Sequence, residues 1–171
     1  MHFQSFTILS LAALTLAFPA TLQTRQAGVL KATTFNDISI AGGVSGNAEE
    51  EAAAAFSALN LNDLTSISKA DLDFLNEVNQ VANDAETDAF NPAVEAATGA
   101  AADAAQRGKI KNKVLKLMAT VIKLEAQGAQ GQDVAAKLAE ETKKLDNNIA
   151  TDKKDAGKAS TAVPFDAVIQ N

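Results

Sequence analysis

The stretch "GKIKNKVLKLMATVIKLEAQ", residues 108–127, alternates lysines with bulky aliphatic residues and decides the fold class. Its apolar positions recur at spacings of four and three, which is the period of one face of an α-helix. The main apolar stripe consists of Ile110, Val114, Leu117, Val121 and Leu124, and a second stripe lies beside it. Together the two stripes cover about half of the helix surface, so we expect this helix, about residues 100–127, to contact several neighbours at the centre of a bundle.

Four lysines fall on the opposite face of the same helix: Lys109, Lys113, Lys116 and Lys123. One interpretation is a solvated face whose lysine stems cover the apolar edge. The other is a binding face for an anionic partner, such as a phospholipid headgroup or an acidic polymer. A helix lying on a membrane would need a free apolar face. In the predicted bundle, that face packs against neighbouring helices instead. The sequence leaves both interpretations open.

A second long helix precedes this stretch. Ser68 is a candidate N-cap with Asp71 three positions on, and apolar residues then recur at helical spacing to about Phe90. We expect the helix to stop there, because Pro92 disfavours helical geometry at the residue before it. The proline can itself begin a short helix that ends at Gly99.

A third long helix is predicted at about residues 134–155, after a turn at residues 128–133. Asp133 is its candidate N-cap. Because so short a loop joins neighbouring helices in opposite directions, we expect an antiparallel arrangement. Gly108 marks either a bend or the start of the central helix.

The predicted fold is all-α: an antiparallel bundle of three long helices plus one or two short ones, with an extended N-terminal segment. A short alanine-rich helix should begin after Asn47, the candidate N-cap. We assign the bundle to residues 47–160 and an irregular segment, which lays apolar side chains on the helices, to residues 18–46. The tail, residues 161–171, either packs back on the bundle or frays.

The N-terminus carries a short apolar run without charge, "ILSLAALTLAF", residues 8–18. It is too short to cross the roughly 30 Å of a bilayer as a helix. It is typical of a secretory signal peptide, residues 1–17, although no lysine or arginine precedes the run. The alternative is a buried N-terminal helix.

Small residues at Thr15 and Ala17 favour cleavage between Ala17 and Phe18. A second trimming after Arg25 stays open. No later apolar run reaches membrane-spanning length, so we expect a secreted, extracellular protein without a transmembrane segment.

The available side chains limit the chemistry. Removal of a signal peptide would take away His2, and the rest of the chain has no histidine, cysteine, tyrosine or tryptophan. This excludes the commonest general base, thiolate catalysis and the usual zinc ligands. Composition leaves serine–lysine catalysis open, but no Gly-x-Ser-x-Gly motif occurs. We therefore expect no enzyme, no catalytic residue, no metal and no cofactor. The formal charge of −6 argues against a nucleic-acid partner.

Four runs carry a resemblance that covers nearly the whole chain. They are "TTFNDISIAGGVSGNAEEEA" (33–52), "VNQVANDAETDAFNPAVEAA" (78–97), "QRGKIKNKVLKLMATVIKLEAQGAQG" (106–131) and "AKLAEETKKLDNNIATDKKDAGKAST" (136–161). The chain resembles an uncharacterised group of small secreted proteins of filamentous fungi, which implies an exported, all-helical effector candidate without a catalytic motif. More remotely, its size and helix content are similar to fungal hydrophobic surface binding proteins and cell-wall mannoproteins, some of which hold lipids between helices.

Two functions follow as expectations. The first is a non-enzymatic secreted interaction protein of a fungus, effector-like or acting at the cell surface, with a protein, cell-wall or host-surface partner. The alternative is an extracellular binder or carrier of an apolar ligand, such as a lipid, in a groove between helices. The candidate lining residues, which equally well fill a core, are Phe56, Phe74, Phe90, Leu115, Met118 and Ile122.

Overall fold

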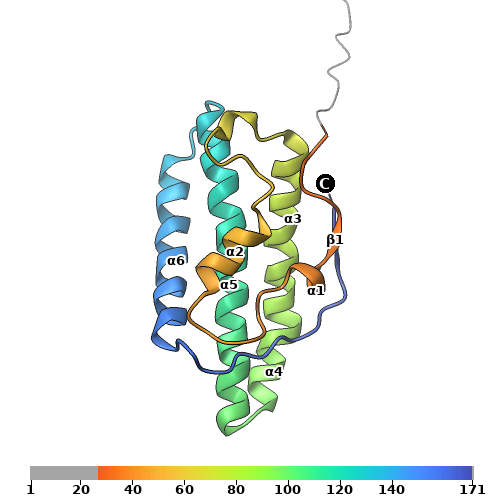
Figure 1. Ribbon diagram of the computed structural model, residues 1–171, viewed down its shortest axis with the longest axis vertical. Coiled ribbons are helices and arrows are strands. Elements are labelled where there is room, and N and C mark those ends of the chain that lie inside the picture. Colours follow the sequence, from red (N-terminus) through yellow and green to blue (C-terminus); the bar gives the residue numbers. More distant parts are fainter. Residues whose placement is uncertain (1–26, 171) are drawn as a thin grey trace, which may run out of the picture.

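The computed structural model describes residues 27–170 and contains three long helices that lie side by side (Figure 1). They are α3 (Lys69–Ala85), α5 (Gly99–Ala129) and α6 (Ala135–Lys154). α5 contacts both α3 and α6 along its length, as its broad apolar surface requires. Successive long helices run in opposite directions, so the predicted antiparallel bundle is confirmed. The predicted cleavage site, Ala17 and Phe18, lies outside the described residues.

The shorter elements pack around this layer. α2 (Ala48–Ala55) lies across α5, and α1 (Phe35–Ile38) lies on the side of α3 (Figure 1). A 3₁₀ turn, η1, spans Leu64–Ser66. Two short strands, β1 (Thr33–Thr34) and β2 (Val168–Ile169), pair in antiparallel fashion. The N-terminal segment is therefore partly extended and partly helical, and its buried Phe35 belongs to the main core.

The N-terminus of α3 confirms the predicted cap. The Ser68 hydroxyl accepts a hydrogen bond from the backbone N–H of Asp71, with 3.1 Å between the two atoms. The Asp71 carboxylate in turn accepts from the Ser68 hydroxyl at 2.7 Å and from the backbone N–H of Leu30 at 2.9 Å. This one capping pair therefore also fastens the N-terminal segment to α3.

The expected helix stop near Phe90 is wrong. α3 continues through a π-helical turn, η2 (Glu86–Phe90), directly into α4 (Asn91–Ala96). Asn91 keeps helical geometry, with φ −60° and ψ −51°, although Pro92 follows it. The π turn widens the hydrogen-bonding ring, and the Asn91 N–H donates to the Glu86 carbonyl five positions back.

Two predicted helix starts differ in detail. Asp133 is not the N-cap of α6, because Val134 occupies that position without a side-chain hydrogen bond. Asn47 is the N-cap residue of α2, as predicted, but its side chain does not cap the helix. Instead, Oδ2 of Asp152 in α6 accepts from the N–H groups of Gly46 and Ala48, both at 2.9 Å. A distant helix thus supplies the cap.

The C-terminal tail packs on the bundle rather than fraying. Ile169 is fully buried, and Phe165 meets Phe35 edge-on, with 5.9 Å between the ring centres. On its way the tail crosses α5 at Gly108, where the Thr161 N–H donates to the Ala104 carbonyl at 3.0 Å. Gly108 therefore marks a close backbone crossing in the body of α5, and not the start of the helix.

Candidate functional site

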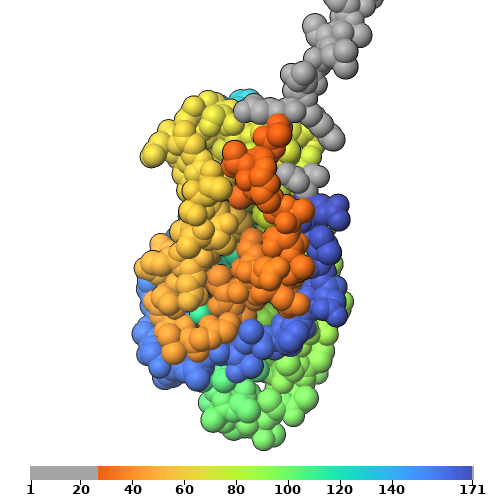
Figure 2. Space-filling model, turned by 45° about the vertical axis from the view of Figure 1, so that its right-hand side comes forward, coloured from red at the N-terminus to blue at the C-terminus, as the bar shows by residue number. Residues whose placement is uncertain are grey.

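A groove of about 790 Å³ opens between the N-terminal segment and α2. One wall comes from residues 29–42, and the other comes from residues 51–58 of α2 and the turn after it. Phe74 of α3 also lines the groove. Figure 2 shows the hollow between these two parts of the chain. The groove depends on how the N-terminal segment wraps the bundle, and helical periodicity could not reveal it.

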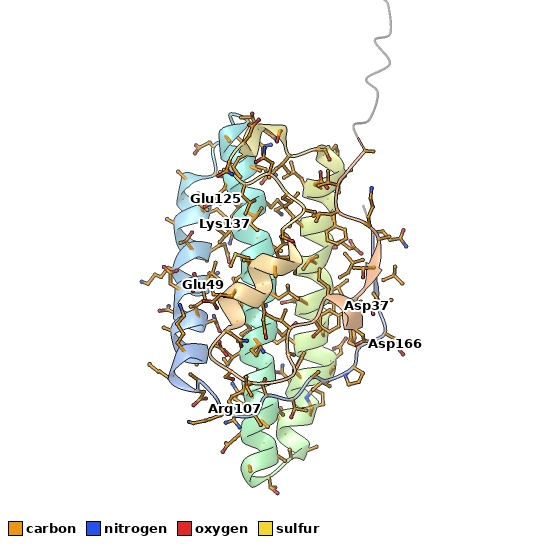
Figure 3. All side chains as sticks on the ribbon, in the orientation of Figure 1. Asp37, Glu49, Arg107, Glu125, Lys137 and Asp166 are labelled. Carbon is orange, nitrogen blue, oxygen red and sulfur yellow. The ribbon has the colours of Figure 1, made fainter. Side chains whose placement is uncertain are left out.

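The lining is mainly aliphatic. Its apolar residues are Val29, Leu30, Ala32, Ile38, Ile40, Ala54, Ala55, Ala58 and Phe74. The charged residues of the lining have partners within the protein: Lys31 Nζ donates to the Gly28 carbonyl at 3.1 Å, and Asp37 accepts from the Thr34 hydroxyl at 2.7 Å. Figure 3 shows Asp37 on α1, on the side of the molecule where the tail runs. The arrangement suits an apolar ligand body with few polar contacts.

A buried lysine, Lys111, binds two residues that line the groove, Gly42 and Glu51. The Lys111 side chain has no exposed surface, and its ammonium donates to the carbonyl oxygens of Gly42 at 2.8 Å and Val44 at 3.0 Å. It also forms an ion pair with Oε2 of Glu51 at 2.6 Å. The N-terminal segment, α2 and α5 therefore meet at one ammonium group.

Lys111 was not among the four lysines predicted from the sequence to form a binding face. A signal was present, because Lys111 stands three and four positions before Val114 and Leu115, and this spacing places it on the apolar face of α5. A lysine on an apolar face needs buried acceptors. Those acceptors come from segments far away in the chain, which a helical pattern does not identify.

Two of the four predicted lysines form ion pairs with one carboxylate, that of Glu86. Nζ of Lys113 and of Lys116 lies 3.0 Å and 2.9 Å from the carboxylate of Glu86 in the π turn. Burial by itself would raise the pKa of Glu86, but hydrogen bonds and charge from Lys116 and Lys113 outweigh it, and the pKa lies below its ordinary value. This part of the lysine face serves to join α5 to the end of α3.

The other two predicted lysines differ from this pair. Lys123 Nζ donates to Oδ1 of Asn76 at 2.9 Å, and burial lowers the pKa of Lys123. It lines a smaller polar pocket of about 350 Å³ together with Lys69 and Asp73, which pair with each other. Lys109 is half-buried. The structure thus divides the four lysines among three surroundings and does not gather them into one site.

Most of the predicted groove residues lie elsewhere. Phe74 lines the groove, and Met118 is partly buried against the core. The other four predicted residues are buried in the core: Phe56, Phe90, Leu115 and Ile122. The facing helices pack closely enough to fill the space between them, so the groove forms where the less regular N-terminal segment meets α2.

Within residues 27–170, no helix combines the length and apolar character needed to cross a membrane. In the same part of the chain, no three His, Asp or Glu side chains are grouped in a way that could hold a metal ion.

Comparison with known proteins gives one match. The family model described as a domain of unknown function, DUF8454, matches residues 30–164. This match spans both walls of the groove from Leu30 on, Lys111 and all three long helices. Curated proteins and solved structures give no match. Since the matched region covers most of its length, the chain belongs to the DUF8454 family.

Proposed function

We propose that this protein is a secreted, non-enzymatic binding protein that holds a small, largely apolar ligand, such as a single-chain lipid, in the groove between the N-terminal segment and α2. The groove itself carries the proposal. Its volume of about 790 Å³ falls within the roughly 300–1,000 Å³ of small-molecule pockets. Its walls are aliphatic, and its charged residues already have partners.

Three further observations support the proposal. The apolar run at residues 8–18 is typical of a signal peptide, and the family match begins downstream of it, at residue 30. Without that signal segment the chain lacks histidine, cysteine and tyrosine, so a non-enzymatic role is favoured. The resemblance to small secreted proteins of filamentous fungi supports a role outside a fungal cell.

The test is a fluorescence titration of the secreted protein with cis-parinaric acid, followed by displacement with unlabelled fatty acid. Ala53 and Ala54 are adjacent, exposed residues of α2, but only Ala54 lines the groove. We expect Ala54→Phe to fill part of the groove and weaken binding about tenfold, which corresponds to about 1.4 kcal/mol. Ala53→Phe, the matched control, should bind as the parent protein does. Absence of saturable binding, or equal loss in both variants, would overturn the groove as the binding site.

A macromolecular partner at a cell wall or host surface is the second candidate. The observation that favours it is the exposure of two large apolar side chains, Val29 at 51% beside β1 and Val168 at 54% in β2. In that case the parent protein would sediment with purified fungal cell walls. The Ala53→Phe and Ala54→Phe variants would then show no difference with the lipid probe.

A further inference from the structure

Lys111 is the most deeply buried charged side chain of the described chain. Its ammonium group donates hydrogen bonds to the Gly42 and Val44 carbonyls at 2.8 and 3.0 Å and forms an ion pair with Glu51 Oε2 at 2.6 Å. The other carboxylate oxygen of Glu51 accepts from the Asn47 side-chain amide at 2.9 Å. A buried charge with this many partners is held in one geometry, because each lost partner would leave a charged group poorly solvated.

Two of these acceptors belong to opposite walls of the groove. Gly42 lines it from the N-terminal segment, and Glu51 lines it from α2. Lys111 reaches both from α5. The ammonium group therefore connects the two walls at Gly42 and Glu51.

The loop that carries Gly42 and Val44 has other attachments to the bundle besides Lys111. On its other side the loop bonds to the tail: Ser45 N–H donates to the Lys158 carbonyl at 3.0 Å, and the Ser160 hydroxyl donates to the Ala41 carbonyl at 2.6 Å. Removal of the ammonium group would thus leave the loop attached and remove a connection between the walls. A role in groove geometry is therefore separable from a role in folding.

We infer that Lys111 is the positioning residue of the groove, which sets the separation of its two walls and hence the width of ligand that fits. The first half of this inference concerns the protein without ligand, and only the second half rests on the proposed function. The selectivity of the groove would then be determined from α5, by a residue that does not itself line it.

The wall separation can be measured directly. The chain contains no cysteine, so Ala32→Cys and Ala58→Cys introduce spin labels at two exposed positions on opposite walls. Distances between the labels are compared by electron paramagnetic resonance in three backgrounds: the parent, Lys111→Met and Lys113→Met. We expect a narrow distribution in the parent and in Lys113→Met, whose lysine pairs with Glu86 away from the groove. Lys111→Met should give a longer and broader distribution. The same distribution in all three folded proteins would overturn the inference.

If Lys111→Met does not fold, as judged by circular dichroism, Glu51→Gln replaces it. This change keeps the size of the side chain and one acceptor oxygen, and removes the charge opposite Lys111. A broader distribution again supports the inference, and an unchanged one overturns it.

The ligand measurement then separates the two claims. If Lys111→Met increases the separation of the groove walls, it should weaken binding of cis-parinaric acid about tenfold, or about 1.4 kcal/mol. The comparison is made under conditions where the variant is fully folded. Leu145→Ala, a buried change in α6 away from the groove, is the control for lost stability alone and should leave the affinity unchanged. If the parent protein binds no probe, the proposed function fails, while the distance comparison still decides the role of Lys111.

Discussion

Gly108 lies inside α5, where glycine is ordinarily less favourable than alanine by about 1 kcal/mol. Here the backbone of the tail passes directly over it. A Cβ atom at this position would lie 2.0 Å from the Thr161 carbonyl oxygen and 3.2 Å from the Ala41 carbonyl oxygen. Backbone atoms on both sides leave little room for adjustment. We predict that Gly108→Ala lowers the free energy of unfolding by about 1–3 kcal/mol, as overpacking does, measured by urea denaturation.

The matched control is Gly128→Ala near the end of the same helix. A Cβ atom there would come no closer than 3.2 Å to the Val134 side chain, which can move. This change should leave stability nearly unaltered or raise it slightly, because alanine favours the helix. Stabilisation by Gly108→Ala would show that the tail does not press on α5.

At the scale of elements, the π turn η2 is fastened to α5 by ion pairs. The Glu86 carboxylate forms ion pairs with Lys113 and Lys116 of α5, and its pKa lies below the ordinary value of 4.5. A carboxylate with a lowered pKa in the folded state adds stability above its unfolded pKa. That contribution is lost as the pH falls through the folded pKa. The connection between the end of α3 and the centre of the bundle is therefore sensitive to acid.

We predict that Glu86→Gln is less stable than the parent protein near neutral pH and that the difference shrinks as the pH falls below 4.5. Thermal unfolding of both proteins across the acid range measures this convergence. Glu95→Gln in α4 removes the same charge at an exposed position and is the control. A difference between parent and Glu86→Gln that stayed constant with pH would mean that shape, and not charge, holds the turn.

At the scale of the whole molecule, the two ends of the described chain close the fold together. β1 pairs with β2, Phe35 meets Phe165, and Ile169 is fully buried in the core. We predict that Ile169→Ala lowers the free energy of unfolding by about 2–5 kcal/mol, as for other buried aliphatic residues. The neighbouring Val168, 54% exposed in the same strand, provides the comparison: Val168→Ala should change stability by about 0.5 kcal/mol or less. Equal effects in guanidinium denaturation would mean that the tail is not part of the cooperative unit.

The fold class and the order of the long helices were predictable from the sequence, because helical periodicity is local. The stripes around Val114 and Leu117 place α5 at the centre, and Ser68 with Asp71 marks the start of α3. The path through Pro92 was not predictable. The π turn that carries the chain past it is stabilised by contacts between Glu86 and α5, and a local rule for proline does not include them.

The candidate site could not be predicted from the sequence, because it depends on contacts between residues far apart in the chain. The Lys111 ammonium meets Gly42, 69 positions away, and Asp152 caps α2 at Ala48, 104 positions away. Charge and hydrogen bonding act between groups that the fold brings within about 3 Å, and a helical pattern carries no information on such distant partners. The sequence by itself determined the three long helices and their order, because helical periodicity is local. Only the tertiary structure decided where the groove lies and which distant groups Lys111 binds, because both depend on the wrapping of an irregular segment around the bundle.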